Sequence, residues 1–266
     1  MTLSLDRITL AVPEVSAARA FYTAVLSPDV TEDSAGTTLD MHGTGRVALS
    51  SDERPGAERG AESVATGFPG FIVSYIVPQP GEVELLLEAA LRNGATVLKP
   101  AQKGFFGGFS ATFRAPDGAL WKVSAPTKKD TGPAARPPVP TETAVLLGVA
   151  DPKASQAFYR ALGMTVDRNY GRTYSDFVPA PGSGRLGLMP RRALAKDVGV
   201  GEQGDSLSPP VFTRCAETRA EVDALLAAAV SAGGRDVIAA EETEQGGYSA
   251  QFTDPDGFCW RLAHRG

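Results

Sequence analysis

The chain has few of the residues that most often form disulfides or coordinate metals. Among its 266 residues are only two cysteines and two histidines. Cys215 and Cys259 both lie in apolar stretches, where buried, reduced thiols are expected. The histidines, His42 and His264, lie in different halves at non-equivalent positions, so structural roles are expected for both.

The chain also has no excess of positive charge and no long apolar run. The net charge of −5 argues against nucleic-acid binding, which usually needs a basic face. No stretch approaches the roughly 18 consecutive apolar residues of a membrane span. The N-terminus has no basic segment followed by a long apolar run, so no signal peptide is predicted. We therefore expect a soluble, cytoplasmic protein without nucleic-acid or membrane partners.

What the chain does contain is a hairpin sequence that occurs twice. Residues 107–123 are GGFSATFRAPDGALWKV, and residues 246–262 are GGYSAQFTDPDGFCWRL. Apolar and polar residues alternate before the turn, as in a half-buried strand. Proline, aspartate and glycine at Pro116, Asp117 and Gly118 are typical of a tight turn. Each copy therefore predicts a β-hairpin.

The same repeat extends along the whole chain. The two hairpins are offset by 139 residues, and the Phe-Tyr pairs at residues 21–22 and 158–159 are offset by 137. This spacing indicates a tandem duplication of a unit of ordinary domain size. We predict domain 1 at residues 1–124, a proline-rich linker at 125–141 and domain 2 at 142–266. With two domains already in one chain, a monomer is expected.

Each half shows a strand, a helix and about three further strands, and then the same order again. The fold class expected is therefore α+β, with two tandem domains, each of paired βαβββ modules forming a curved eight-stranded mixed sheet. Strands are predicted at residues 5–12, 37–41, 47–49, 70–77, 96–98, 109–113, 120–123, 145–149 and 211–215. Helices are predicted after residue 16 and at residues 82–92, 154–162 and 221–233.

These modules, with the Phe-Tyr helix and the Pro-Asp-Gly hairpin, resemble the vicinal oxygen chelate superfamily. That group includes glyoxalase I, extradiol dioxygenases and bleomycin-resistance proteins. The resemblance covers residues 5–124 and 143–264. It implies metal ligands on the concave face of each sheet, at positions that carry Arg7, Ala144, Lys122 and Arg261 here. Cationic and methyl side chains do not coordinate metals. We expect no metal and no cofactor.

Two clefts are predicted as small-molecule sites, because they combine apolar walls with a few polar groups. The predicted ligand-binding residues are Arg7, Thr9, Phe105, Phe106 and Lys122 for the first cleft, and Tyr170, Tyr174, Phe177, Arg214, Tyr248 and Arg261 for the second. Core packing is the alternative role for each aromatic residue. The catalytic residues, if there are any, are not predicted.

Two functions remain open at this point. One is a metal-independent, bleomycin-resistance-like protein that binds an aromatic or acidic metabolite. The other is a metal-free isomerase, cyclase or lyase that uses the same cleft for acid–base chemistry. In either case Arg7 and Lys122 are predicted to share one concave wall. Either the carboxylate of Asp40 or an anionic ligand would compensate their charge, and the ligand is favoured.

Overall fold

The computed structural model describes residues 1–33, 36–51, 67–104, 108–203, 209–243 and 246–265. A strand, a helix and three strands follow one another four times, and we number these units modules 1 to 4 in chain order. Module 1 contains β1 (Arg7–Ala11), α1 (Val15–Leu26), β2 (Asp29–Asp33), β3 (Gly36–Asp40) and β4 (Arg46–Ser50). Module 2 contains β5 (Phe71–Ile76), α2 (Pro80–Arg92), β6 (Thr96–Lys103), β7 (Phe109–Arg114) and β8 (Leu120–Ala125).

The second half repeats this order with one extra helix. Module 3 contains β9 (Glu142–Val149), α3 (Pro152–Ala161), β10 (Val166–Asn169), β11 (Ser175–Phe177) and β12 (Arg185–Pro190), followed by α4 (Arg191–Val198). Module 4 contains β13 (Val211–Ala216), α5 (Arg219–Ser231), β14 (Arg235–Glu242), β15 (Tyr248–Thr253) and β16 (Cys259–His264). None of these helices is long and apolar enough to cross a membrane.

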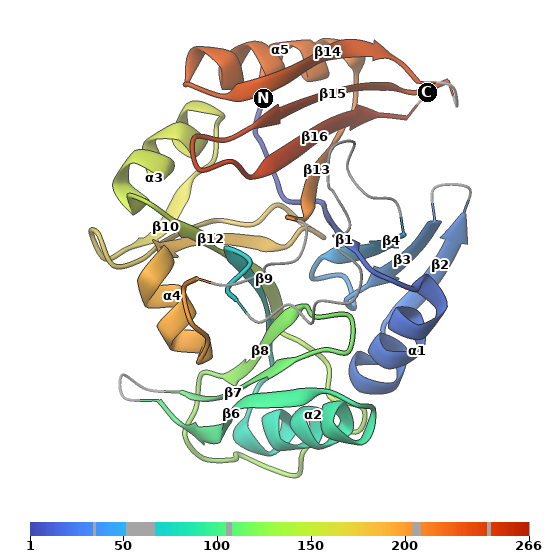
Figure 1. The fold of residues 1–266 in the computed structure, drawn as a ribbon, viewed down its shortest axis with the longest axis vertical. Helices are drawn as coiled ribbons and strands as arrows, with labels where there is room; N and C mark the ends of the chain where they lie inside the picture. Colours follow the sequence, from blue (N-terminus) through green and yellow to red (C-terminus); the bar gives the residue numbers. More distant parts are fainter. Residues whose placement is uncertain (34–35, 52–66, 105–107, 204–208, 244–245, 266) are drawn as a thin grey trace.

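The strands form two mixed sheets of eight strands, which confirms the predicted α+β class and its βαβββ modules. The outer sheet, in the order β14-β15-β16-β13-β1-β4-β3-β2, joins modules 4 and 1. The inner sheet, in the order β10-β11-β12-β9-β5-β8-β7-β6, joins modules 3 and 2. Antiparallel pairs β1–β13 and β5–β9 connect the modules. Each sheet therefore takes one module from each half of the sequence (Figure 1).

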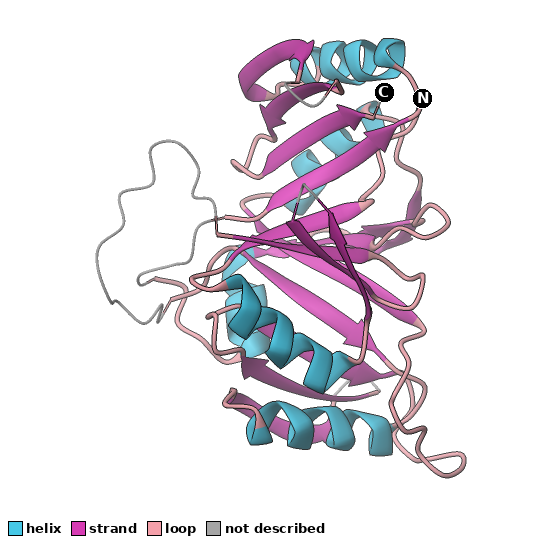
Figure 2. Cartoon of the chain, turned by 90° about the vertical axis from the view of Figure 1, so that its right-hand side faces the viewer, coloured by secondary structure: helices cyan, strands magenta, loops and turns pink. Residues whose placement is uncertain are grey.

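Four helices cover one face of the sheets. Helices α1 and α5 pack on the outer sheet, and α2 and α3 on the inner sheet. Alternate strand residues such as Ile8, Leu10 and Trp121 point into this layer and join one continuous buried core. Figure 2 shows helices at opposite ends of the molecule with strands between them. We call the face of each sheet turned away from these four helices its far face.

The far face of the inner sheet is covered by α4. Leu194, Ala195 and Val198 of this helix are buried in a second apolar cluster with Ile72 of β5 and Leu120 of β8. No helix is predicted from the sequence over the segment that contains α4. Its apolar residues nevertheless recur at helical spacing, and Gly199 ends it in the left-handed conformation (φ 84°).

The proline-rich segment 125–141 connects two strands of one sheet, β8 and β9. It packs against the start of α2, where Gln79 Oε1 accepts hydrogen bonds from the backbone N–H groups of Thr131 (2.8 Å) and Gly132 (3.2 Å). Asp130 Oδ1 in turn accepts one from the Gly81 N–H (2.7 Å). The domain boundaries at 124 and 142 remain a prediction from the sequence repeat.

Candidate functional site

Residues directly opposite one another on neighbouring strands form a matching row on the far face of each sheet. The outer row is Arg7, Thr213, Arg261 and Gln251, on β1, β13, β16 and β15. The inner row is Ala144, Ser74, Lys122 and Thr112, on β9, β5, β8 and β7. The rows are related by the duplication, with an offset of 137 for the first pair and 139 for the other three.

The outer row brings two predicted site residues, Arg7 and Arg261, to the two sides of Thr213. Thr213 is 1% exposed, and both arginines are half-buried. Among the described residues, Thr213 Oγ1 and Arg261 Nε are buried without a hydrogen-bond partner. A buried polar atom that makes no hydrogen bond costs about 1–3 kcal/mol, so both groups favour a further partner.

Three kinds of polar group therefore meet in the outer row. Guanidinium groups are planar, permanently charged donors that match carboxylates and phosphates. The Thr213 hydroxyl and the Gln251 amide add neutral donors beside them. Gln251 Oε1 accepts a long contact from Cys259 Sγ (3.7 Å), which leaves its amide nitrogen as the donor for other groups. This arrangement can bind a small anion.

The four positions at which the family resemblance implies metal ligands all lie in the two rows. They carry Arg7, Arg261, Lys122 and Ala144, none of which is a ligand for a divalent cation. Within the described part of the chain, no group of three or more His, Cys, Asp and Glu residues is placed to hold a metal ion. These residues do not fit a metal.

The inner row makes its polar contacts with α4. Lys122 Nζ forms an ion pair with Asp197 Oδ2 (2.6 Å), and Thr112 Oγ1 donates a hydrogen bond to the Val198 carbonyl (3.0 Å). The prediction that Arg7 and Lys122 share one wall is wrong, because β1 belongs to the outer sheet and β8 to the inner sheet. Lys122 is compensated by Asp197 within the chain.

The remaining predicted residues of the inner sheet lie away from the inner row. Tyr170 is 66% exposed, and its ring lies 6.1 Å from that of Tyr174. Tyr174 donates a hydrogen bond to Asp176 Oδ2 (2.7 Å), and burial together with this bond raises the pKa of its phenol. Phe177 is fully buried in the core against Tyr159. Phe105 and Phe106 lie outside the described residues.

The other predicted residues of the outer sheet have partners within the chain. Arg214 forms ion pairs with Asp6 (2.9 Å) and Glu221 (2.7 Å) on the helix side of β13. The Tyr248 hydroxyl donates to Asp223 Oδ1 (2.9 Å). Thr9 is half-buried on β1, next to Ala48 of β4 and Val211 of β13, and lies beside the outer row.

Four members of the rows, and the acidic partner of Lys122, are not among the predicted residues: Thr213, Gln251, Ser74, Thr112 and Asp197. The first four share the strand alternation and the 139-residue offset of the predicted residues, so the repeat itself carries the signal that could have found them. To place them beside Arg7 and Arg261, one must know which modules share a sheet. The local sequence does not contain that information. Asp197 could be placed only once α4 was known.

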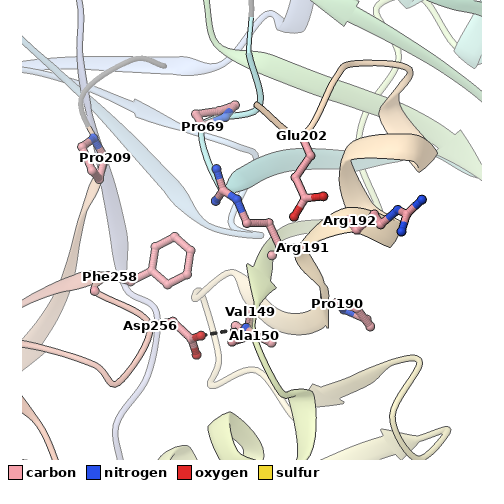
Figure 3. A pocket seen from close by; sticks show the side chains of 12 residues that line it. Pro69, Val149, Ala150, Pro190, Arg191, Arg192, Glu202, Pro209, Asp256 and Phe258 are labelled. Carbon is pink, nitrogen blue, oxygen red and sulfur yellow. Dashed lines mark hydrogen bonds between the residues drawn. The ribbon is translucent and has the colours of Figure 1, made fainter. Parts of the chain in front are cut away.

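A separate cavity of about 550 Å³ lies between module 3 and the β15–β16 turn (Figure 3). Arg191, at the start of α4, donates from Nη2 to the Phe68 carbonyl (2.8 Å), and its guanidinium lies 5.2 Å from the Phe68 ring centre. Asp256 accepts from the Ala150 N–H (2.8 Å). Its lining mixes Arg191 and Arg192 with Glu202 and Asp256, so it has no dominant charge.

Comparison with known proteins agrees with this architecture. Glyoxalase I from Zea mays superposes with a TM-score of 0.67 at 18% identity, over 98% of this chain and 92% of that chain. A putative dioxygenase from Bacillus subtilis gives a TM-score of 0.62 at 15% identity, over 99% of this chain and 85% of that one. At these identities the likeness concerns the fold alone. None of the curated proteins compared with the chain matches it.

A family model, described as Glyoxalase/Bleomycin resistance protein/Dioxygenase superfamily, matches the sequence twice, at residues 4–123 and 143–262. These two matches cover most of the chain and coincide with the two halves of the duplication. The chain belongs to the Glyoxalase/Bleomycin resistance protein/Dioxygenase superfamily.

Proposed function

We propose that this member of the superfamily is a metal-independent small-molecule-binding protein that holds an acidic metabolite, aromatic or aliphatic, on the far face of the outer sheet. The observation that carries the proposal is the outer row. Two positions at which the family resemblance implies metal ligands are arginines here, on one face and on either side of Thr213. Such a site attracts carboxylates rather than cations.

The energetics of the row support an acidic ligand. Charged side chains are seldom buried without a partner, because the lost hydration must be replaced. A carboxylate over Thr213 would accept hydrogen bonds from the hydroxyl and from Arg261 Nε, the two donors that lack partners among the described residues. Each charge-assisted bond contributes about 1.5–3 kcal/mol.

A metal-free isomerase, cyclase or lyase at the same face is the alternative. Such an enzyme needs a group that gains and loses a proton near the working pH. The outer row supplies guanidinium, hydroxyl and amide groups, which serve as hydrogen-bond donors, and it contains neither a carboxylate nor an imidazole. The row therefore favours binding, and conversion of a retained molecule during incubation would favour the enzyme.

The test combines ligand discovery with one substitution. Native mass spectrometry of the purified protein should identify a retained small acid, and calorimetry should then give its affinity. Arg261→Met should weaken binding about 10- to 100-fold, because one charge-assisted contact is lost. Arg192→Met, at an exposed arginine, is the matched control.

Elemental analysis of the purified protein is part of the same experiment. We expect much less than one transition metal per chain, and an affinity for the retained acid that does not change after chelation. Unaltered binding by Arg261→Met, or a stoichiometric metal on which binding depends, would overturn it.

A further inference from the structure

We infer that the end of α4 occupies the inner row in the way that a ligand would. Because the two rows are equivalent, its contacts indicate the chemistry of the acid that the outer row binds. This acid carries a carboxylate and, a few bonds away, a second oxygen that accepts a hydrogen bond. The inference rests on the proposed function, because it names the class of molecule that the same face takes.

The first support is the equivalence of the two rows. Lys122 and Arg261 are both cations at the same position of the last strand of a module. Ser74 and Thr213 are both hydroxyl residues on the neighbouring strand, buried to 5% and 1% exposure. The duplication thus placed the same kinds of group on both faces, and among the described helices only α4 covers a far face, that of the inner sheet.

The second support is what α4 offers to these groups. Asp197 places a carboxylate oxygen 2.6 Å from Lys122 Nζ, and Val198 places a carbonyl oxygen 3.0 Å from Thr112 Oγ1. Lys122 and Thr112 are directly opposite each other on β8 and β7. Opposite residues of an antiparallel pair have Cα atoms about 4.5–5.5 Å apart. The two oxygens that satisfy the cation and its neighbour come from consecutive residues of α4.

The outer row presents the same pair of groups to a ligand. Arg261 and Gln251 are directly opposite on β16 and β15. Arg261 takes the place of Lys122 as the partner of a carboxylate, and the Gln251 amide takes the place of the Thr112 hydroxyl as the donor to the second oxygen. Thr213, with its hydroxyl unpartnered among the described residues, supplies one more donor to the carboxylate.

The residues next to the outer row limit the size and polarity of the bound acid. Leu194 and Val198 of α4 pack against Ile72, Leu120 and Leu146 on the inner sheet. The equivalents of the last three on the outer sheet are Val211, Cys259 and Thr9, which are smaller or more polar. The outer face therefore suits a short oxo- or hydroxy-carboxylic acid rather than an apolar helix.

The experiment compares two probe acids that differ in the second oxygen. Pentanoate and 4-oxopentanoate, which have the same carbon chain, are titrated into the whole protein, with binding followed by NMR. The expected result is one acid per chain, because α4 covers the inner row, with 4-oxopentanoate bound about 2- to 10-fold more tightly, as one neutral hydrogen bond allows. Gln251→Leu should abolish the preference for 4-oxopentanoate over pentanoate, whereas Arg261→Met should weaken both acids. Gln102→Leu, the same change at an exposed glutamine of β6, is the control.

The outcomes separate the two proposals. If neither acid binds the unaltered protein, the proposed function fails and this inference fails with it. If both acids bind equally, or if the preference survives Gln251→Leu, the inference is overturned while acid binding stands. Two acids per chain would also overturn it, because the inner row would then be open.

Discussion

At the scale of single residues, a buried hydrogen-bond chain explains why each half carries a Phe-Tyr pair and a hairpin tryptophan. In the second half, Trp260 Nε1 donates to the Tyr159 hydroxyl (3.2 Å), which donates to Asp254 Oδ2 (2.6 Å). Tyr159, Trp260 and Asp254 are all fully buried. These two hydrogen bonds connect α3 to β16 and to the turn before it. The hairpin and the helix are therefore held together by polar contacts as well as by packing.

The first half contains the same series of hydrogen bonds, with a carboxylate from a different position. Trp121 donates to Tyr22 (3.2 Å) and Tyr22 to Asp117 Oδ2 (2.6 Å). The sequence equivalent of Asp254 is Ala115, which has no carboxylate, so the turn aspartate takes this part. The hydrogen bond was thus kept through the duplication although the residue that accepts it changed.

Removing the Tyr159 hydroxyl should destabilise the protein. In Tyr159→Phe, Asp254 Oδ2 loses its donor in a buried setting, so we expect the free energy of unfolding to fall by about 1–3 kcal/mol. Urea denaturation measures this. Tyr248→Phe removes a tyrosine–aspartate bond at the surface, where water can replace it, and should cost clearly less. Equal losses in the two variants would contradict the buried role.

Asp254 should also make stability depend on pH. Burial raises the pKa of this carboxyl to about 6 in the folded protein, above the value of about 3.9 in an unfolded chain. Between these two values the folded state holds a proton that the unfolded state releases. The stabilisation from this group is therefore complete below about pH 4 and is lost as the pH rises through about 6.

The measurement is urea denaturation of the unaltered protein and of Asp254→Asn, from about pH 4 to about pH 7.5. Other titrating groups cancel in the comparison. The unaltered protein should lose about 2–3 kcal/mol relative to the variant across this range, as a shift of about two pKa units requires. A difference between the two proteins that does not change with pH would show that the pKa of Asp254 is not raised.

At the scale of elements, α4 is the part that makes the two faces unlike. It is short, with eight residues, and an isolated helix of that length is not stable in water. Its order therefore depends on burial of Leu194, Ala195 and Val198 and on the ion pair of Asp197 with Lys122. Lys99 Nζ adds a hydrogen bond to the Lys196 carbonyl (2.7 Å).

Truncation of the central apolar residue should release this helix. Leu194 is fully buried, so Leu194→Ala should cost about 2–5 kcal/mol locally. Hydrogen exchange should become faster in residues 191–198 and over β5 and β8, while the outer sheet stays protected. Lys196→Ala, at an exposed position of the same helix, should leave exchange nearly unchanged. Faster exchange spread evenly over both sheets would instead indicate global destabilisation.

The elements that the sequence predicted are those with strong local signals. The modules and their order could be predicted from strand alternation, from the Pro-Asp-Gly turns and from the glycine that follows α2. Each of these signals depends only on residues close together in sequence. The choice of partners for β1 and β5 depends on contacts between residues far apart in sequence, and local patterns do not record it. Arg7 and Arg261 were found as candidates, but their meeting over Thr213 required the pairing of β1 with β13.

At the scale of the whole molecule, the two sheets are not independent units. One buried core cluster contains residues of all four modules, including Ile8, Tyr75, Leu147 and Phe212. Helices α1 and α2 also pack together, as do α3 and α5, so helices of one sheet contact helices of the other. We therefore expect a single cooperative unfolding transition for the described fold.

The two tryptophans allow a direct test, since Trp121 lies in the inner sheet and Trp260 in the outer sheet. Trp121→Phe and Trp260→Phe each leave one tryptophan as a reporter of one sheet. Within each variant, the urea midpoint by fluorescence should coincide with that by far-ultraviolet circular dichroism. Separate midpoints in either variant would mean that the sheets unfold one at a time.

A ribosome would finish the inner sheet first, because its last strand ends at Pro190, whereas the outer sheet waits for His264. Until then β1 has β4 on one side and an open edge on the other, while the 199 residues between Ala11 and Val211 are still being made. An open strand edge invites pairing with other nascent chains, and a charged side chain on such a strand discourages it. Arg7 lies on this edge strand. The guanidinium that lines the site in the complete fold would therefore also reduce aggregation of the chain during synthesis.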